Sequence, residues 1–136
     1  MKIHSIPGKL EVNWLDDVKA ILDKWSSYNI TLNDFRDAVL VKGLDYSKAH
    51  GGRAWIVDSS EAVGAFSEQI QNFIGTDIFP AFSKNGVKYF ITITSKKSAI
   101  TEMTVSEYSE KAGPAGITLV EVDNFDQAID FLKQKK

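Results

Sequence analysis

Short apolar runs alternate with longer amphipathic stretches along most of this chain, and this alternation constrains the fold more than any other feature of the sequence. Three of the runs occupy residues 53–58, 87–94 and 117–122, and each contains several β-branched or aromatic side chains. Such runs are typical of strands buried within a sheet. Strands that alternate with helices predict an α/β fold with a mixed, mainly parallel sheet, right-handed crossovers and helices packed on the sheet.

The N-terminal part of the chain predicts a hairpin at the start of this sheet. Apolar and polar side chains alternate over residues 9–14, as expected for a half-buried strand. Residues 18–25 fit either a second strand or a short helix, and Asp16 and Asp17 between the two runs favour the tight turn of a hairpin. With this hairpin we expect a sheet of four or five strands.

Two of the stretches between strands have clear helical patterns. Thr31 is placed to cap the first helix, and Gly43 is expected to interrupt it before the glycines at 51–52. The second pattern extends over residues 60–85 and contains Pro80. Because proline removes a backbone donor and clashes with the preceding turn, we expect a kink or a helix restart near Asp77.

Composition excludes several classes of protein. The 136 residues suit a single domain, which we expect to span residues 1–136, and 43% hydrophobic with 25% charged residues are ordinary values for a globular chain. The absence of cysteine excludes disulfide scaffolds, iron–sulfur clusters and thiol catalysis. A net charge of -2 and two arginines, Arg36 and Arg53, argue against nucleic acid as a partner.

Neither a secretion signal nor a membrane span is expected. Pro7 and Gly8 stand where a signal peptide needs an unbroken apolar stretch. Nowhere does the sequence approach the run of about eighteen apolar residues that a spanning helix needs. We therefore expect a cytoplasmic protein.

Catalysis and cofactor binding lack their usual motifs. The glycine–serine–glycine elbow of hydrolases and a glycine-rich phosphate loop are both absent. His4 and His50 lie far apart, and neither has an acid or a second histidine at the spacing of a metal site. We therefore expect no enzyme activity, no cofactor and no metal. An enzyme that pairs His50 with a nearby acid is the alternative.

The loop and helix start after residues 53–58 are the most informative segment for function. Ser67 lies where the helix is expected to begin, and a serine there commonly caps the helix by accepting a backbone N–H. A phosphate on Ser67 would add nearly two negative charges beside the positive end of the helix dipole and repel a partner docked on the loop. Physics alone favours the capping role over this phospho-acceptor role.

Two sets of candidate site residues follow from this segment. The helical region that begins near Phe66 and ends near Phe82 holds four of the eight phenylalanines of the chain. Most of them are expected in the core, but some could line a gap or a partner surface. The candidate partner-binding loop and helix comprise Ser59, Ser60, Phe66, Ser67 and Gln71. The candidate apolar pocket comprises Phe73, Phe79 and Phe82.

The sequence resembles the STAS-like group, in particular the SpoIIAA-like proteins related to anti-sigma-factor antagonists. The resemblance covers about residues 9–134 and rests on the segments AILDKW, ITLNDFRDAV, WIVDSS, IFPAFSKNGVKYFITI and VEVDNFDQAIDFL. It implies a mixed sheet with helices, no catalysis, and a phosphorylatable serine at the helix start. Ser67 falls at about that place, although Phe66 stands where the family pattern has aspartate. SpoIIAA-like proteins have also been likened to the CRAL-TRIO lipid-binding fold, which implies an apolar ligand.

Two hypotheses of function result. The first is a non-enzymatic regulatory module that resembles anti-sigma-factor antagonists, binds another protein and is switched by serine phosphorylation. The alternative is a carrier of a small apolar ligand or lipid, held between the phenylalanine-rich helix and the sheet. A homodimer is compatible with both hypotheses.

Overall fold

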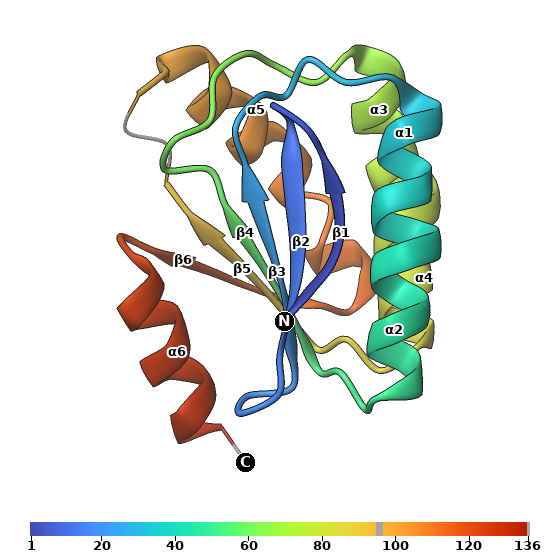
Figure 1. Ribbon diagram of the computed structural model, residues 1–136, viewed down its shortest axis with the longest axis vertical. Coiled ribbons are helices and arrows are strands. Elements are labelled where there is room, and N and C mark those ends of the chain that lie inside the picture. The colour runs from blue at the N-terminus through green and yellow to red at the C-terminus, as the bar shows by residue number, and fades with distance from the viewer. Residues whose placement is uncertain (95–96, 136) are drawn as a thin grey trace.

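A mixed β-sheet forms the centre of the molecule (Figure 1). Within residues 1–94 and 97–135, which the computed structural model describes, six strands lie side by side in the order of the sequence. They are β1 (Lys2–Ile6), β2 (Leu10–Leu15), β3 (Ala20–Trp25), β4 (Ala54–Asp58), β5 (Tyr89–Ile93) and β6 (Thr118–Val122). β1, β2 and β3 pair antiparallel, whereas β3 to β6 run parallel to one another.

Helices follow each parallel strand and pack on the sheet. The first long helix consists of α1 (Leu32–Arg36), the π-helical η1 (Asp37–Gly43) and α2 (Leu44–Ala49). The second consists of α3 (Glu68–Phe73), the π-helical η2 (Ile74–Ile78) and α4 (Phe79–Lys84). Shorter elements are α5 (Ala99–Ser109), the 3-10 turn η3 (Gly113–Ala115) and α6 (Phe125–Gln134). None of the helices in the described part of the chain is long and apolar enough to cross a membrane.

The two faces of the sheet bury separate apolar clusters, because successive side chains of a strand point to opposite faces. Ile21 and Trp55 belong to the larger cluster, which includes side chains from both long helices and α5. Leu22 and Ile56 belong to the smaller cluster with Leu132 of α6. Crossovers of one hand, running in one direction along the sheet, return on one face. This explains why α1 to α5 share a face and α6 covers the other (Figure 1).

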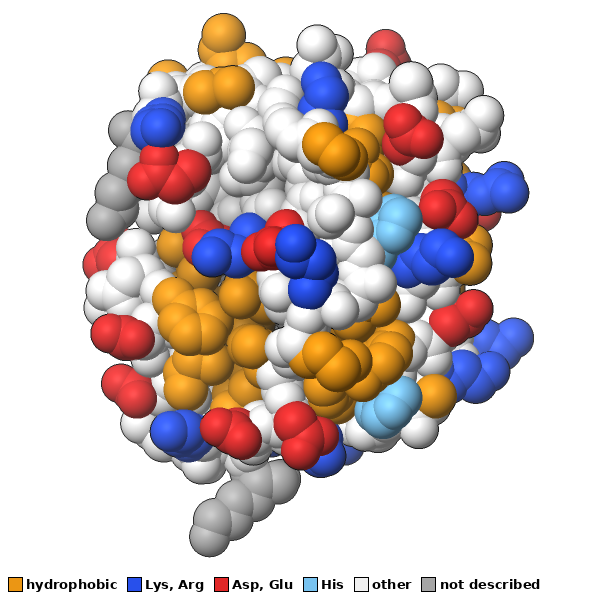
Figure 2. Space-filling view, viewed as in Figure 1, with side chains coloured by type: hydrophobic (Ala, Val, Ile, Leu, Met, Phe, Trp, Pro, Cys, Tyr) orange, Lys and Arg blue, Asp and Glu red, His pale blue; other side chains and the backbone are white. Residues whose placement is uncertain are grey.

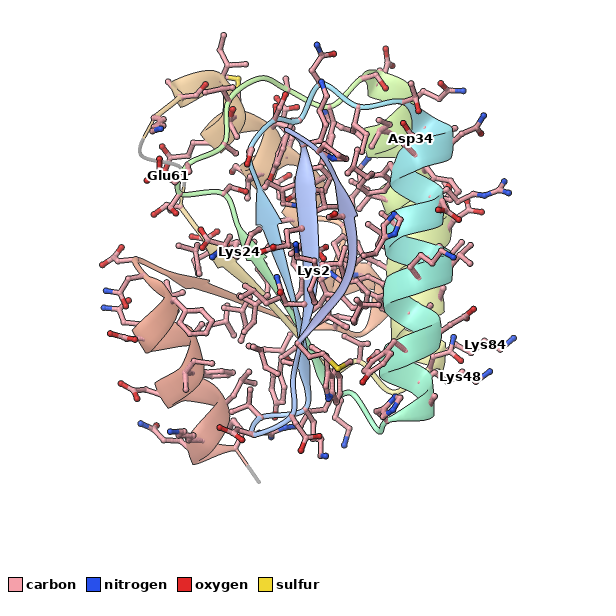
Figure 3. All side chains as sticks on the ribbon, in the orientation of Figure 1. Lys2, Lys24, Asp34, Lys48, Glu61 and Lys84 are labelled. Carbon is pink, nitrogen blue, oxygen red and sulfur yellow. The ribbon has the colours of Figure 1, made fainter. Side chains whose placement is uncertain are left out.

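Charged side chains cross the middle of the view in Figure 2. They include Lys2 and Lys24, which are labelled in Figure 3, and Lys2 forms an ion pair with Glu11 of β2 at 3.3 Å. Hydrophobic side chains are visible beside α6, below this charged row. Glu11 lies opposite Lys24 in the register between β2 and β3, so the row crosses the face of these strands.

The hairpin at the start of the sheet is confirmed. β2 and β3 pair antiparallel from Leu10↔Trp25 to Leu15↔Ala20. The segment 18–25, which fitted a strand or a helix, therefore contains a strand. However, the sheet has one strand more than the four or five predicted, because β1 adds an edge strand to the hairpin. Its side chains are exposed or half-buried, and the alternation that identifies strands is therefore weak there.

The long helices confirm the cap at Thr31 and correct the interruption at Gly43. The Thr31 hydroxyl accepts the Asp34 N–H at 3.1 Å. The helix continues through Gly43, and the missing side chain there makes room for the Trp55 ring: an added Cβ would lie 2.8 Å from Cη2 of the indole. Near Asp77, where a kink or restart was expected, the helix continues as the π-helical η2 and passes into α4, where Pro80 occupies a tolerated first-turn position.

Candidate functional site

One carboxyl group lies on the apolar face of β3. Asp23 shares this face with Ile21 and Trp25, which both belong to the larger apolar cluster, and its side chain is only 2% exposed. Burial of an ionisable group among apolar side chains is costly unless the group is paired. The surroundings of Asp23 therefore decide whether this residue has a structural or a functional role.

Asp23 has one hydrogen-bond partner for its two carboxyl oxygens. The indole N–H of Trp55 donates to Oδ2 at 2.8 Å, and Oδ1 has no partner among the described residues. Desolvation raises the pKa of Asp23 to about 7, and the bond from Trp55 opposes this rise. Near neutral pH the group is therefore divided between its protonated and ionised forms.

A cavity of about 20 Å³ adjoins Asp23 between the sheet and the long helices. Every residue that lines it is buried, so the cavity lies inside the molecule. Most of its wall is aromatic: Trp25, Phe35, Trp55, Phe66, Phe79, Phe82, Phe90 and Tyr108. A volume of this size holds one water molecule or a group of similar size.

Three buried hydroxyl groups form a chain that begins at the cavity wall. The Tyr108 hydroxyl lies 3.1 Å from the Tyr28 hydroxyl, which in turn is hydrogen-bonded to the Ser59 hydroxyl. Burial raises the pKa of both tyrosines, so their hydroxyls remain protonated near neutral pH. The chain thus links α5, the segment after β3 and the loop after β4 through neutral groups.

Phe66 closes the cavity on the side of the loop between β4 and α3. Its ring stacks on Tyr28 at a centroid distance of 4.1 Å and meets the edges of Trp25 and Phe35, each at 5.1 Å. The other rings of the wall belong to strands or helices, whereas Phe66 lies in a loop outside regular secondary structure. Among the described residues of the wall, Phe66 is therefore the one ring that no strand or helix carries.

The two π-helical segments flank the same cavity. Val39 of η1 and both Ile74 and Ile78 of η2 line it. π-Helical turns are rare and occur frequently at functional sites, because they displace side chains from the regular helical positions. The two π-helical segments beside one cavity therefore point to a functional site independently of Asp23.

The predicted partner-binding loop is divided between surface and interior. Ser67 is exposed and caps α3 by accepting the Ile70 N–H at 3.2 Å, as predicted. Ser60 and Gln71 are half-buried and bond within the loop region, to Asp58 and to a backbone carbonyl. Ser59 and Phe66 of the predicted set are buried. The structure thus places them in the interior, where they contribute to the hydroxyl chain and the cavity wall.

Two of the three residues of the candidate apolar pocket line the water-sized cavity. Phe79 and Phe82 line the cavity beside Asp23. Phe73 is half-buried and packs against the core, edge to face with Phe35 at 6.5 Å, without lining the cavity. The phenylalanine-rich helix therefore does supply part of a cavity wall.

His50 stands at the end of α2, where its ring Nδ1 lies 2.9 Å from the carbonyl oxygen of Tyr46. Its ring is exposed and stacks on Tyr46 at 3.9 Å, and no hydrogen bond or ion pair joins it to a carboxylate of the described residues. Within residues 1–94 and 97–135, no group of three or more acidic or histidine side chains could hold a metal ion. The pairing that the alternative enzyme hypothesis requires is thus not found in this part of the chain.

Sequence reasoning did not assign a role to Asp23, Tyr28 or Tyr108. A signal for Asp23 was present, since it is a charged residue on the same strand face as Ile21 and Trp25. A charged side chain in register with apolar ones on a buried strand face is a candidate functional residue. No comparable signal marks the tyrosines, because their hydroxyls meet only through tertiary packing.

Chemically, the site offers one carboxyl acceptor within an aromatic wall. Searches of protein-family models, of curated proteins and of solved structures found no match to this chain.

Proposed function

We propose that this protein binds a small, mainly apolar molecule beside Asp23, in a site that forms when Phe66 moves aside and enlarges the present cavity of about 20 Å³. The proposal rests on one observation: a fully buried carboxyl group with an unpaired Oδ1 lines a cavity with aromatic walls. Sites for small molecules are typically apolar, with a few polar groups that orient the ligand. Binding without chemical turnover is the form that we propose.

A purely structural role for Asp23 is the competing explanation. A single water molecule in the cavity would satisfy Oδ1, and the volume of about 20 Å³ suits it. However, a neutral residue at this position would avoid the cost of burying a charge. A buried carboxyl group that lowers the stability of the folded state is typical of a binding site.

Small aromatic compounds test the proposed function. We expect toluene and benzyl alcohol to raise the melting temperature of the full chain in a saturable way, since a ligand that binds the native state stabilises it. Val39→Leu adds a methylene group to the cavity wall and should abolish this effect. Val41→Leu on the same π-helical segment is the matched control, because Val41 is 41% exposed and does not line the cavity. Equal ligand responses of the two variants would contradict the proposal.

Native mass spectrometry of protein isolated from its own host is the second test. We expect the folded chain to carry a small molecule that is lost on denaturation. A folded chain with its bare mass, together with no response to the aromatic compounds, would reject the proposed function in favour of a structural water.

The surface of the same loop favours a second candidate function. Val63 is 47% exposed, and Ser67 presents its capping hydroxyl at the surface. We propose, following the resemblance to STAS-like proteins, that this surface binds another protein in the cytoplasm and that phosphorylation of Ser67 regulates the contact. Peptide mapping of the native protein tests for the phosphate. If no phosphate is found and Ser67→Asp and Ser67→Ala bind the partner equally, regulation by phosphorylation of Ser67 is rejected.

A further inference from the structure

The electrostatic character of the cavity wall restricts which molecule can bind. Among the described residues that line the cavity, Asp23 is the one carboxyl group, and none is lysine, arginine or histidine. Its single hydrogen-bond donor is the indole of Trp55, which contacts Oδ2. Oδ1 therefore offers an acceptor with no positive charge beside it.

The aromatic rings of the wall also favour a positively charged ligand. The face of an aromatic ring carries negative charge density, and it attracts cations, particularly where water is excluded. A carboxyl acceptor among such rings favours a donor or a cation and disfavours a second anion. Fatty acids and other carboxylates are therefore poor candidates for this cavity.

We propose that the ligand is an amine with an apolar body, whose ammonium group pairs with Oδ1 of Asp23. This inference rests on the proposed function and names its ligand class. The ammonium group would replace the missing partner of Oδ1 with a charge-assisted hydrogen bond. The apolar body would lie against the aromatic wall, which supplies most of the surface that the ligand buries.

The cavity as it stands has room for the head group alone. An ammonium head group is about as large as a water molecule, so the volume of about 20 Å³ admits the head group as it stands. The apolar body needs additional space. The proposal places this space at Phe66, the one ring of the described cavity wall that lies outside strands and helices.

The protonation state of Asp23 adds a dependence on pH. The pairing needs an ionised carboxyl and a protonated amine, and burial raises the pKa of Asp23 to about 7. Tyr28 and Tyr108, which also act on this site, have raised pKa values and stay neutral near pH 7. An alkylamine keeps its proton well above neutral pH. Affinity for the amine should therefore increase as the pH rises through about 7.

Calorimetric titration of the full chain with four compounds that share one ring tests the assignment. At about pH 8 we expect benzylamine to bind at least about tenfold more tightly than benzyl alcohol or toluene, and benzoate to show no binding. The same titrations at about pH 6 should show a smaller preference for the amine. Asp23→Asn should remove the preference for the amine while retaining affinity for the neutral compounds. The control Asp34→Asn, which changes an exposed carboxyl on α1, should keep the preference for the amine.

The possible results separate this inference from the proposed function. Equal affinities for benzylamine, benzyl alcohol and toluene would overturn the amine assignment and leave the apolar ligand site standing. No binding by any of the four compounds would overturn both. Preference for benzylamine that persists in Asp23→Asn would place the amine elsewhere and would also overturn the assignment.

Discussion

Trp55 and Asp23 are joined across two neighbouring parallel strands by a hydrogen bond of 2.8 Å, in which the indole N–H donates to Oδ2. Both side chains are at least 98% buried, since Trp55 is 1% and Asp23 is 2% exposed. The indole satisfies one carboxyl oxygen and, on its opposite flank, lies against the backbone at Gly43. This one contact therefore connects the charge of the site with the packing of the helix above it.

Replacing the buried carboxyl should stabilise the protein at higher pH. The folded-state pKa of Asp23 is raised from 3.8 to about 7, so between these values the folded state binds more protons than the unfolded state and stability falls as the pH rises. The shift corresponds to roughly 4 kcal/mol, lost progressively up to about pH 7. We expect Asp23→Asn to unfold at similar urea concentrations to the parent near pH 4 and at clearly higher ones near pH 8.

The matched control for this comparison is Asp34→Asn. Asp34 is exposed on α1, so its substitution should leave the pH dependence of stability unchanged. Parallel pH profiles of the parent and Asp23→Asn would mean that Asp23 does not titrate as its burial requires.

Removing the indole donor should destabilise the fold most strongly where Asp23 is ionised. Trp55→Phe keeps an aromatic ring but leaves both carboxyl oxygens unpaired, for which we expect a loss of about 1–3 kcal/mol in the free energy of unfolding. The loss should be larger near pH 8 than near pH 5, because an ionised group needs the donor more. Chemical denaturation at the two pH values measures it.

Trp14→Phe provides a comparison for the loss of an indole N–H. The Trp14 indole donates to the exposed Asp16 at 3.3 Å, where water can replace it. We expect a smaller loss without the dependence on pH. If the two variants behaved alike, the burial of the Trp55 contact would have no energetic consequence.

A methyl group at position 43 should push the Trp55 ring out of place. Alanine usually stabilises a helix interior by up to about 1 kcal/mol relative to glycine. At Gly43, however, the new Cβ would lie 2.8 Å from the indole. We expect overpacking to exceed the gain in propensity, giving a net loss of about 1–2 kcal/mol, together with a changed Trp fluorescence spectrum. Gly113→Ala is the control, since no atom lies within 4 Å of its added Cβ; a neutral result at both positions would refute the contact.

Substitutions at Ser67 should distinguish the cap from the charge. Ser67→Ala removes the acceptor for the Ile70 N–H and should cost about 1 kcal/mol. Ser67→Asp retains an acceptor at the positive end of the helix and should remain within a few tenths of a kcal/mol of the parent. Thermal unfolding of both variants measures this. Ser106→Ala, on an exposed part of α5, should show no loss; an equal loss there would show that the cap is unimportant.

The order of strands and helices was largely accessible from the sequence, and the site was accessible only in part. Runs such as residues 87–94 identify buried strands because, apart from Lys88, their side chains are apolar, aromatic or β-branched. β1 was missed because an edge strand is held by pairing with its neighbour, which leaves little pattern in its own residues.

The cavity itself follows from contacts that no local pattern encodes. The phenylalanine-rich helix indicated a gap near Phe79 and Phe82, and the structure places both in the wall. The register between β3 and β4, which brings Trp55 to Asp23, arises only when the whole sheet has assembled. The π-helical turns likewise depend on packing, since the intrinsic preferences of their residues do not distinguish them from ordinary helix.

Phe66 and Ser67 are consecutive residues, one in the wall of the cavity and the other on the surface. If displacement of the ring also shifts the Ser67 hydroxyl that begins α3, a ligand in the cavity and a protein bound to the outside of the loop are coupled. If both proposed activities are present, thermodynamic reciprocity requires that each occupant alters the affinity of the other by the same factor. The amount of protein partner bound would then depend on the concentration of the small molecule.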